Sequence, residues 1–532
     1  MQIPILIIGG GPAGLCSSIS LSRLGIRSLL VERHPATSIH PKATAVSTRT
    51  MELFRTWGLE PSIRELALDV DFVSSIRANL SSAEVDRPAL GFPSREEALA
   101  FSATAPAVIA QDVLEPILLQ HARGYLTAEI RFDTELCAFE QTEQGVRAIV
   151  MDRKTGERTS VEARYMIAAD GANSFVRREL GISTHGVDRI GEYLSILFRA
   201  DMDRVVPGRQ CGLYVLHGLG NPAPSVALPT SRDGRWVLAT PWRGDGRPLA
   251  SLGESELVGL VRHAAGVPDL DVTVLDSQLV GIGAAVAERF RDRNVFLVGD
   301  AAHRTAPTGG TGMNTAIHAA HNLAWKIAAV VSGVAGDTLL DTYEPERRPS
   351  GERNLLRSRG QLQGVSALAA DMGVVYSSGA VVADEVERPA VIEPTAIACV
   401  GSRAPHVWLD ADGERLSIHE LFGHRYLLLT SVDGAAWRRA SRRVADVLHV
   451  PLGAVTIGGA ELAVEGDDWL AMYGIDRDGA VLVRPDGHIA WRSTGTAADP
   501  VATLAMVMAS VLGRRGEHEA LLSKGGSDRR CA

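Results

Sequence analysis

The sequence predicts an α/β protein with three units: a fold built on a parallel sheet, an antiparallel sheet inserted into it, and a compact α/β module near the carboxyl terminus. A buried strand at residues 3–8 leads through glycines into an apolar-periodic helix and a second buried strand. A second strand, glycine-rich loop and long helix begin at Val295. Between these two segments, short runs with period-two alternation are separated by Gly, Pro and Asp turns.

The glycines after the first strand match G-x-G-x-x-G. The candidate binding residues in this loop are Gly9, Gly11, Pro12, Ala13 and Gly14. The loop follows a strand, opens a helix and precedes an acid, Glu32, at the end of the next strand. Such glycines let the backbone approach a pyrophosphate, and such an acid accepts ribose hydroxyls. A glycine-rich turn without a ligand is the alternative, but the context favours a Rossmann-like dinucleotide-binding fold.

The second strand–loop–helix segment favours FAD over NAD. Gly299 and Asp300 end the strand, where Asp300 is placed to bond ribityl hydroxyls. The next loop would lay bare backbone against the flavin ring at a helix amino terminus, whose dipole stabilises negative charge on the reduced ring. The candidates in this loop are Pro307, Gly309, Gly310, Thr311, Gly312, Met313 and Asn314. The alternative is an ordinary turn capped by Asp300.

The runs from about 186 to 286 predict the antiparallel sheet, and 71–102 have a similar character. Period-two alternation places Leu238 on one face with three substrate candidates of the same run. The substrate candidates are Tyr193, Tyr214, His217, Trp236, Thr240 and Trp242. The alternative is that they form sheet core. We expect an FAD-binding domain of 1–70, 103–185 and 286–395, a substrate-binding domain of 71–102 and 186–285, and a carboxyl-terminal domain of 396–532.

Composition excludes several function classes. A chain of 532 residues predicts two or three domains, and a net charge of -9 gives no reason to expect nucleic acid or an anionic membrane as partner. The five cysteines form no C-x-x-C pair and have no metal-ligand spacing, which predicts free thiols and no metal site. No signal peptide is apparent, and the apolar helix from Ala316 carries Lys326 and Asn322. We therefore expect a cytoplasmic protein without a membrane span.

Three motifs in this order resemble the FAD-dependent aromatic hydroxylases, the class A flavoprotein monooxygenases. They are GGGPAG with its acid at 32, Asp170-Gly171 in YMIAADGANSFVRRELGI, and the Gly-Asp of VFLVGDAAHRTAPTGGTGMN. The resemblance covers nearly the whole chain. In this family Asp170 and Gly171 serve both FAD and the nicotinamide donor, whereas the residues alone indicate only a turn that caps a helix.

The resemblance implies further cofactor contacts outside the three motifs. Arg49 in STRTMELFR is implied to lie near the pyrophosphate, and Gln111 near the flavin's linker. Arg33, directly after the ribose-binding acid, is a further candidate. Where the family often has an arginine this chain has Lys42, whose phosphate contact would be a point charge.

The chain is most similar to the branch that acts on polyketide-derived and other polycyclic or phenolic natural products, which implies a role in antibiotic biosynthesis. That branch carries a thioredoxin-like module, which residues 401–513 resemble; without a cysteine pair the module is implied to be structural. The resemblance also implies that NADPH or NADH reduces FAD and that O₂ forms a flavin hydroperoxide, whose distal oxygen passes to an electron-rich ring carbon. No catalytic side chain or metal is required, and no Ser–His–Asp constellation is visible.

Several alternatives stay open. Residues 281–286 nearly repeat the dinucleotide motif, but no suitable acid follows, so we interpret them as structural. We expect His303 to bond local backbone rather than act as a base. A Baeyer–Villiger, ring-opening or drug-inactivating oxygenase would use the same scaffold, as would a flavin-binding protein without turnover. The sequence predicts an aromatic small molecule and O₂ as partners, and leaves open whether the chain forms a homo-oligomer.

Overall fold

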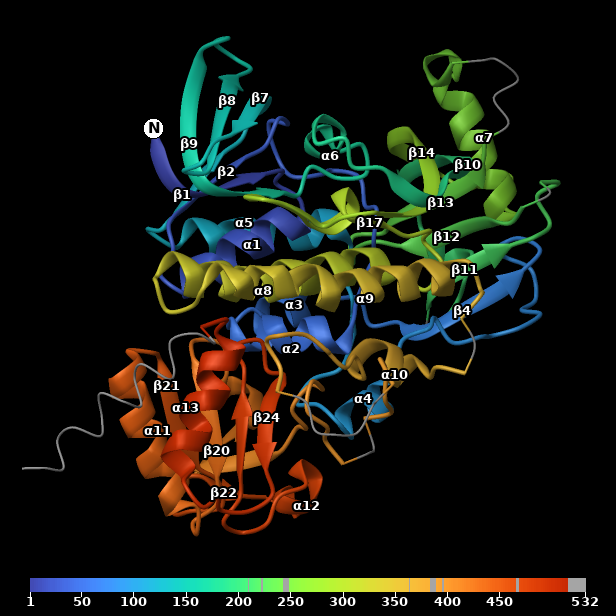
Figure 1. The fold of residues 1–532 in the computed structure, drawn as a ribbon. Helices are drawn as coiled ribbons and strands as arrows, with labels where there is room; N and C mark the ends of the chain where they lie inside the picture. The colour runs from blue at the N-terminus through green and yellow to red at the C-terminus, as the bar shows by residue number, and fades with distance from the viewer. Residues whose placement is uncertain are drawn as a thin grey trace, which may run out of the picture.

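A computed structural model describes residues 1–208, 210–221, 223–242, 248–362, 364–382, 389–394, 397–465 and 468–514. Cys531 and the polar end of the chain after residue 514 lie outside the described residues. In Figure 1 the parallel sheet and its helices lie beside an antiparallel sheet, drawn in green, and above a carboxyl-terminal module, drawn in orange and red. The α/β class predicted from the sequence is confirmed.

The first sheet has eight strands and brings the cofactor motifs to one edge. Its order is β15-β16-β9-β1-β2-β6, with β8 beside β9 and β7 beside β8. The bounds are β1 (Gln2–Ile8), β2 (Ser28–Val31), β6 (Ala128–Arg131), β7 (Thr134–Gln141), β8 (Val146–Asp152), β9 (Arg158–Ala168), β15 (Arg291–Asp292) and β16 (Val295–Leu297). Since β1, β2, β9 and β16 run in parallel, their carboxyl ends meet at the same edge.

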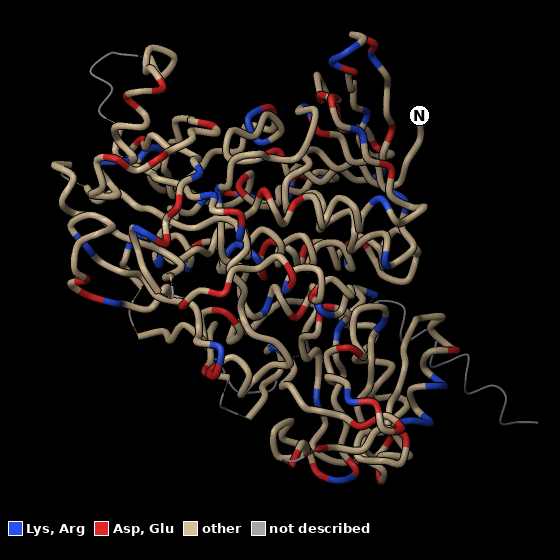
Figure 2. The backbone as a smooth tube through the Cα atoms, turned by 180° about the vertical axis from the view of Figure 1, so that it is seen from behind, with Lys and Arg blue, Asp and Glu red and all other residues tan. Residues whose placement is uncertain are grey.

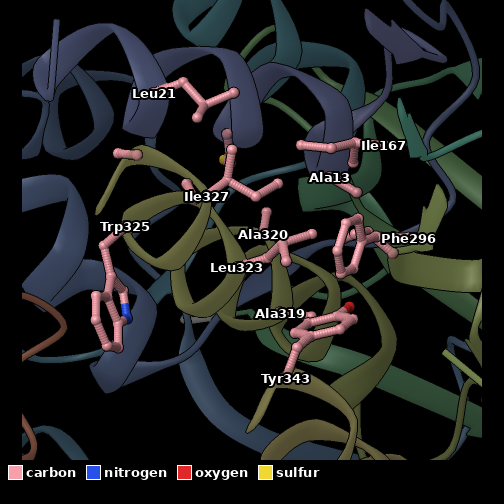
Figure 3. Close-up of a cluster of buried hydrophobic side chains, with 14 of the residues drawn as sticks. Ala13, Leu21, Ile167, Phe296, Ala319, Ala320, Leu323, Trp325, Ile327 and Tyr343 are labelled. Carbon is pink, nitrogen blue, oxygen red and sulfur yellow. The ribbon is translucent and has the colours of Figure 1, made fainter. Parts of the chain in front are cut away.

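Small side chains let two helices pack closely over this sheet. The helices that cover it include α1 (Pro12–Arg23), α5 (Gln111–Arg123), α8 (Thr311–Val331) and α9 (Tyr343–Ser358). Ala13 of α1 and Ala319 and Ala320 of α8 are all buried in one hydrophobic cluster, drawn in Figure 3. Alanine at these positions permits close helix approach without leaving a cavity. Trp325 of α8 points away from these alanines, and its ring centroid lies 5.9 Å from that of Tyr426 in the carboxyl-terminal module.

The second sheet has seven strands, in the order β17-β14-β10-β13-β12-β11-β4. Its bounds are β4 (Asp71–Arg77), β10 (Thr184–Arg199), β11 (Cys211–Leu216), β12 (Ser225–Pro229), β13 (Arg235–Pro241), β14 (Thr273–Ala287) and β17 (His303–Arg304). All pairs are antiparallel except β4 with β11, so a strand from 71–77 closes an edge made by residues far along the chain. Residues 281–286 lie within β14. The predicted domain limits stay a prediction, which this strand order supports.

The two faces of the second sheet have different neighbours. Helix α7 (Glu254–Ala265) covers one face, where Leu194, Ile196 and Phe198 of β10 pack in a core with α7 residues. The other face meets the first domain. Arg235 of β13 donates to Asp112 of α5 over 2.8 Å, which fixes this orientation.

The carboxyl-terminal module contains a four-stranded sheet of order β21-β20-β23-β24. Its elements are β20 (Tyr426–Thr430), α11 (Ala435–Leu448), β21 (Leu452–Thr456), β23 (Ala480–Val483), β24 (Ile489–Ser493) and α13 (Pro500–Val511). Strands β20 and β21 are parallel, while β23 and β24 run antiparallel, an arrangement like that of thioredoxin. A smaller sheet of β18 (Trp408–Ala411), β19 (Glu414–Ser417) and β22 (Ala463–Val464) adjoins it. Cys399, at the module's start, is a buried free thiol.

A buried ionic network joins the module to α8 and α9. Arg484 donates to both oxygens of Glu346, at 2.6 and 2.8 Å, and to Asp486. Lys326 donates to Glu346 over 2.7 Å. Burial raises the pKa of the Glu346 carboxyl, but the charges of Arg484 and Lys326 outweigh it and hold the pKa well below its usual range. Asn322 completes the network by donating to Glu346 over 2.7 Å.

No helix in the described part of the chain has both the length and the apolar character needed to cross a bilayer. Figure 2 shows basic and acidic residues interspersed over the back of the molecule, without a face of one sign.

We expect Arg484→Met to lower the free energy of unfolding by about 3–5 kcal/mol, because it leaves the buried Asp486 without its arginine and Glu346 with Lys326 as its remaining cation. The matched control is Arg147→Met, which removes an exposed arginine paired with Glu140 over 2.8 Å and should change stability by less than about 1 kcal/mol. Urea unfolding followed by tryptophan fluorescence measures both variants. Equal shifts for the two would contradict a dominant role for the buried network.

Candidate active site

In the glycine loop after β1, two glycines lie so close to backbone atoms that a side chain would not fit, and a third lies in open space. A Cβ on Gly14 would lie 1.9 Å from the Gly9 carbonyl oxygen, and a Cβ on Gly9 would lie 2.3 Å from that of Ala169. Gly9 also has a φ of +107°, which side-chain-bearing residues rarely adopt. A Cβ on Gly11 would meet no atom within 4 Å, and no side chain caps the amino terminus of α1. This open, positively polarised helix end fits a pyrophosphate.

Glu32 is held beside that loop. Its Oε2 accepts from the Gly10 N–H over 2.7 Å, and its Oε1 accepts from the His34 N–H over 2.9 Å. Both bonds orient the carboxylate at the end of β2, where a ribose would follow a pyrophosphate bound at Gly11. Arg33 is exposed, and the structure shows its backbone oxygen accepting from Arg153 over 2.9 Å.

Asp300 lies at the same sheet edge, and its carboxylate forms no hydrogen bond with any described residue. Gly299 before it has a φ of +64°, and a Cβ there would lie 3.0 Å from the Cβ of Ala13. Burial raises the pKa of Asp300, while the charges of Arg304 and Lys42 act in the opposite direction. The residue is nevertheless solvent-accessible at this crowded sheet edge, so its carboxylate, without a partner among the described residues, is suited to bond hydroxyls of a ligand such as a ribityl chain.

The amino terminus of α8 lacks a side-chain cap, so its first N–H groups are available to a ligand. Gly309 and Gly310 precede it with φ of +84° and +61°. The structure uses the Asn314 side chain internally: Oδ1 accepts from the Ser47 N–H and the Thr50 hydroxyl, at 2.9 and 2.8 Å. We therefore interpret Asn314 as positioning the loop. Of the other candidates here, Pro307 is exposed, Gly312 half-buried, and Thr311 and Met313 buried.

The Asp170 side chain forms hydrogen bonds at the start of the helix that follows it. Its carboxylate accepts from the Ser174 hydroxyl over 2.6 Å and from the Val176 N–H over 3.0 Å, at the start of α6 (Phe175–Glu179). Gly171 supplies the turn with a φ of +78°. This agrees with the reading of a helix-capping turn from the residues alone.

The structure places Lys42 and Gln111 near Glu115, and their contacts with FAD stay a prediction, whereas Arg49 lies elsewhere. The charge of Lys42 acts on both Glu115 and Asp300, and Gln111 donates to Glu115 over 2.6 Å. Arg49, on α2 (Thr48–Thr56), instead donates to the Asp486 carbonyl oxygen of the carboxyl-terminal module over 2.7 Å. The structure thus assigns Arg49 to the interface between the module and α2, and not to the pyrophosphate.

Most of the substrate candidates lie on the face of the second sheet that α7 covers. Trp236 and Tyr214 are fully buried in the core against α7, with ring centroids 5.5 Å apart. Trp242 packs against the same core, and Thr240 accepts from Ser225 over 2.9 Å. Trp236, Leu238 and Thr240 do alternate as expected, but period-two alternation cannot say which face is core.

Only Tyr193 among the six candidates lies on the face toward the first domain, because its neighbour Leu194 is in the α7 core. His217 is exposed beyond the end of β11. Further half-buried residues lie on the face toward the first domain, and no pattern in the sequence singled them out. They are Leu213, Val215, Val226, Leu228, Ala239 and Gln278. The amphipathic pattern of α7 was the signal that could have identified the opposite face as core.

A serine, a histidine and an aspartate that the sequence did not connect are joined on this face. His40, in the loop after β2, lies between Ser195 of β10 and Asp276 of β14. Its Nε2 is 2.8 Å from Ser195 Oγ, and its Nδ1 is 2.8 Å from Asp276 Oδ2. No such constellation was visible in the sequence, because residues 155 and 236 positions apart meet only in the folded chain.

His303 is buried without a hydrogen-bond partner on either ring nitrogen. The imidazole interacts with the main chain of His303 itself, and the ring packs against Phe290, with centroids 5.8 Å apart. Burial, with a further effect of Arg347, lowers the pKa of His303 to about 3. The residue is therefore a neutral part of the core and not a base.

This arrangement of glycine loop, acid and second helix terminus defines an FAD-dependent oxidoreductase, and comparison with known proteins specifies the class. A family model described as an FAD binding domain matches residues 2–358, and a model described as the carboxyl-terminal part of aromatic-ring hydroxylases matches residues 398–515. The chain belongs to the FAD-dependent aromatic-ring hydroxylases, and it is a flavoprotein monooxygenase.

Its relatives and structural neighbours span the whole chain. A putative polyketide hydroxylase of Streptomyces halstedii is 38% identical, over 96% of this chain and 97% of its own. The tetracenomycin B2 monooxygenase-dioxygenase of Streptomyces olivaceus is 36% identical, over 97% and 99%. The crystal structure of aklavinone-11 hydroxylase with FAD and aklavinone has a TM-score of 0.86 at 34% identity, over 96% of this chain and 99% of that one.

We expect Asp300→Ala to weaken FAD binding about 5- to 150-fold, because each lost hydrogen bond to a buried partner costs about 1–3 kcal/mol. Asp170→Ala, the matched control, removes a cap from α6 and should lower stability with little change in FAD affinity. Flavin fluorescence titration of the apoprotein gives both dissociation constants. Equal values for the two variants and the wild type would refute the assignment of Asp300.

We expect His303→Leu to leave turnover intact and to protect the fold in acid. The unfolded histidine takes up a proton near its ordinary pKa of about 6.5, and the folded one does not until about pH 3, so stability falls with falling pH. Between pH 7 and pH 5 this single group accounts for about 2 kcal/mol. Denaturant unfolding at the two pH values measures how much free energy of unfolding is lost between pH 7 and pH 5. That loss should be smaller by this amount in the variant than in the wild type, and equal losses would contradict the neutral, buried state.

Proposed function

We propose that this enzyme hydroxylates a planar, phenolic polycyclic compound of the aromatic polyketide class, using O₂ and NADPH or NADH. The observation that carries the proposal is the face of the second sheet that meets the FAD-binding domain, where three strands contribute half-buried apolar residues. Val215, Val226 and Ala239 offer a flat apolar surface, and Arg235 on that face is already paired with Asp112. A flat ring system suits this surface better than a small carboxylate.

The relatives support this substrate class. Aklavinone-11 hydroxylase has been solved with FAD and aklavinone, and a second neighbour, the flavin-dependent monooxygenase PieE, with FAD and substrate, at a TM-score of 0.88 and 30% identity. Several relatives are named for polyketide or tetracenomycin oxygenation. A 4-methyl-5-nitrocatechol 5-monooxygenase of Burkholderia sp. is 36% identical, so a smaller phenol is the second candidate.

The protein's own residues would hold the cofactor and shape the reaction. When bound, FAD supplies the redox chemistry that activates O₂. The amino terminus of α1 at Gly11 would bind the pyrophosphate, Glu32 a ribose and Asp300 the ribityl chain. The amino terminus of α8 would stabilise negative charge on the ring. The second sheet would hold the substrate and exclude water from the reacting atoms.

We propose antibiotic biosynthesis as the setting of the reaction. We propose the cytoplasm as the location of the enzyme, since the four described cysteines are free thiols. The carboxyl-terminal module would be structural. A homo-oligomer stays open, to be decided by size-exclusion chromatography with light scattering.

We expect a phenolic polycycle such as quinizarin (1,4-dihydroxyanthraquinone) both to accelerate NADPH oxidation and to gain one oxygen atom from O₂. An electron-rich ring carbon is required, which a phenol offers and an alkane does not. The reaction is run under ¹⁸O₂, and the product mass is compared with the NADPH consumed. A product with oxygen inserted between ring carbons would indicate a Baeyer–Villiger enzyme. A product whose new oxygen comes from water, or a rate of NADPH oxidation that no tested phenol changes, would refute the hydroxylase proposal.

A further inference from the structure

The Ser195–His40–Asp276 chain runs across the boundary between the two domains. His40 and Ser195 are buried, at 3% and 5% exposure, whereas the side chain of Asp276 is 34% exposed. The Ser195 end therefore lies within the protein, on the face of the second sheet that meets the first domain, and the Asp276 end reaches solvent. Ser195 and Asp276 share this face because Ile196, the neighbour of Ser195, packs toward α7 and is paired with Ser277, the neighbour of Asp276.

The geometry fixes the direction in which protons can move. With Nδ1–H donating to Asp276, the Nε2 of neutral His40 is an acceptor, so the Ser195 hydroxyl must donate to it. Ser195 Oγ then keeps its own acceptor sites, for which no described residue supplies a donor. Gln278, directly opposite Ser195 in the β10–β14 ladder, has a buried Nε2 without a partner. An acceptor and a donor thus lie side by side, as the recognition of one hydroxyl group requires.

The same residues do not form a hydrolytic triad. Ser195 lies in the middle of β10, paired with Ala239 on one side and Gln278 on the other. Its backbone is engaged in the sheet on both sides, so the N–H groups that an oxyanion hole needs are not free there. The chain is built to move a proton and not to form an acyl-serine.

We propose that Ser195 receives the hydroxyl proton of the aromatic substrate and that His40 and Asp276 relay it to solvent. The substrate O–H bond breaks with its electron pair left on oxygen, while Ser195 passes its own proton to His40 Nε2. The resulting imidazolium passes its Nδ1 proton to Asp276 and becomes neutral again, and Asp276 releases that proton to water. Gln278 donates to the phenolate oxygen, and the ionised ring is the better nucleophile for the oxygen transfer. This inference rests on the proposed function.

Other charges near the relay do not replace it. Asp112 of α5 faces His40, and Asp112 is neutralised by Arg235 of β13. The backbone of His40 is fixed separately, because its carbonyl oxygen accepts from the Ser38 hydroxyl over 2.8 Å. Changes to the imidazole should therefore affect proton transfer more than the path of the loop.

The test uses FAD-loaded enzyme and quinizarin, whose absorbance reports its ionisation. Ser195→Ala and His40→Asn should raise the apparent pKa of the bound dye by one unit or more and lower kcat about tenfold or more at pH 6.5, with recovery at alkaline pH. Ser277→Ala, on the adjacent β14 position and the opposite face, is the matched control and should match wild type. His40→Gly should regain activity with added imidazole, which a structural role would not predict.

Two outcomes overturn the relay, and they are distinguishable. If wild type hydroxylates quinizarin and the variants keep its pH profile and dye titration while binding FAD normally, the relay alone is wrong. If wild type neither hydroxylates nor ionises any phenol tested, the proposed function fails and the relay fails with it.

Discussion

The close approach of backbone to backbone around the first glycine loop is the constraint on which the rest of the site depends. Gly14 sits against the carbonyl of Gly9, and Gly9 against that of Ala169, at separations that admit no side chain. These contacts hold β1, β9 and the start of α1 together, and the parallel pairing of β9 with β16 extends that arrangement to Asp300. Glu32, which we propose meets the adenosine half, and Asp300, which we propose meets the ribityl chain, are thereby fixed relative to each other by hydrogen-bonded strands.

Local motifs in the sequence predicted the cofactor domain well, because each depends on residues adjacent in the chain. The loop at 9–14, the acid at 32 and the second helix terminus all lie at one sheet edge, as parallel pairing requires. The substrate face was harder, because both faces of the second sheet are apolar and alternation does not reveal which one α7 covers. Trp236 and Tyr214 therefore proved to be core. Contacts such as those of His40 and Arg49 join distant segments, and no local pattern encodes them.

The carboxyl-terminal module also contributes to the shape of the flavin site, although it supplies no group to it. Arg49 and Glu52 of α2 pair with each other over 2.8 Å and reach the module through Asp486 and Arg403. The start of α2 in turn donates to Asn314, which lies in the first turn of α8. A continuous set of hydrogen bonds thus runs from the module to the amino terminus of α8, which would face the flavin. The module therefore stabilises the position of this helix end.

The participation of β4 in the second sheet limits how this enzyme can be recombined with its relatives. The chain enters the sheet at 71–77, leaves it for the first domain, and returns at 184. A chimera that exchanges only the segment from residue 184 onward would pair the β11 of one protein with the β4 of another. The two strands pair in parallel over Cys211–Leu216, so their side chains would have to match along that whole register. A mismatched partner would leave an exposed strand edge, which invites aggregation. Substrate specificity in this scaffold is therefore transferable only when two separate stretches of sequence are exchanged together.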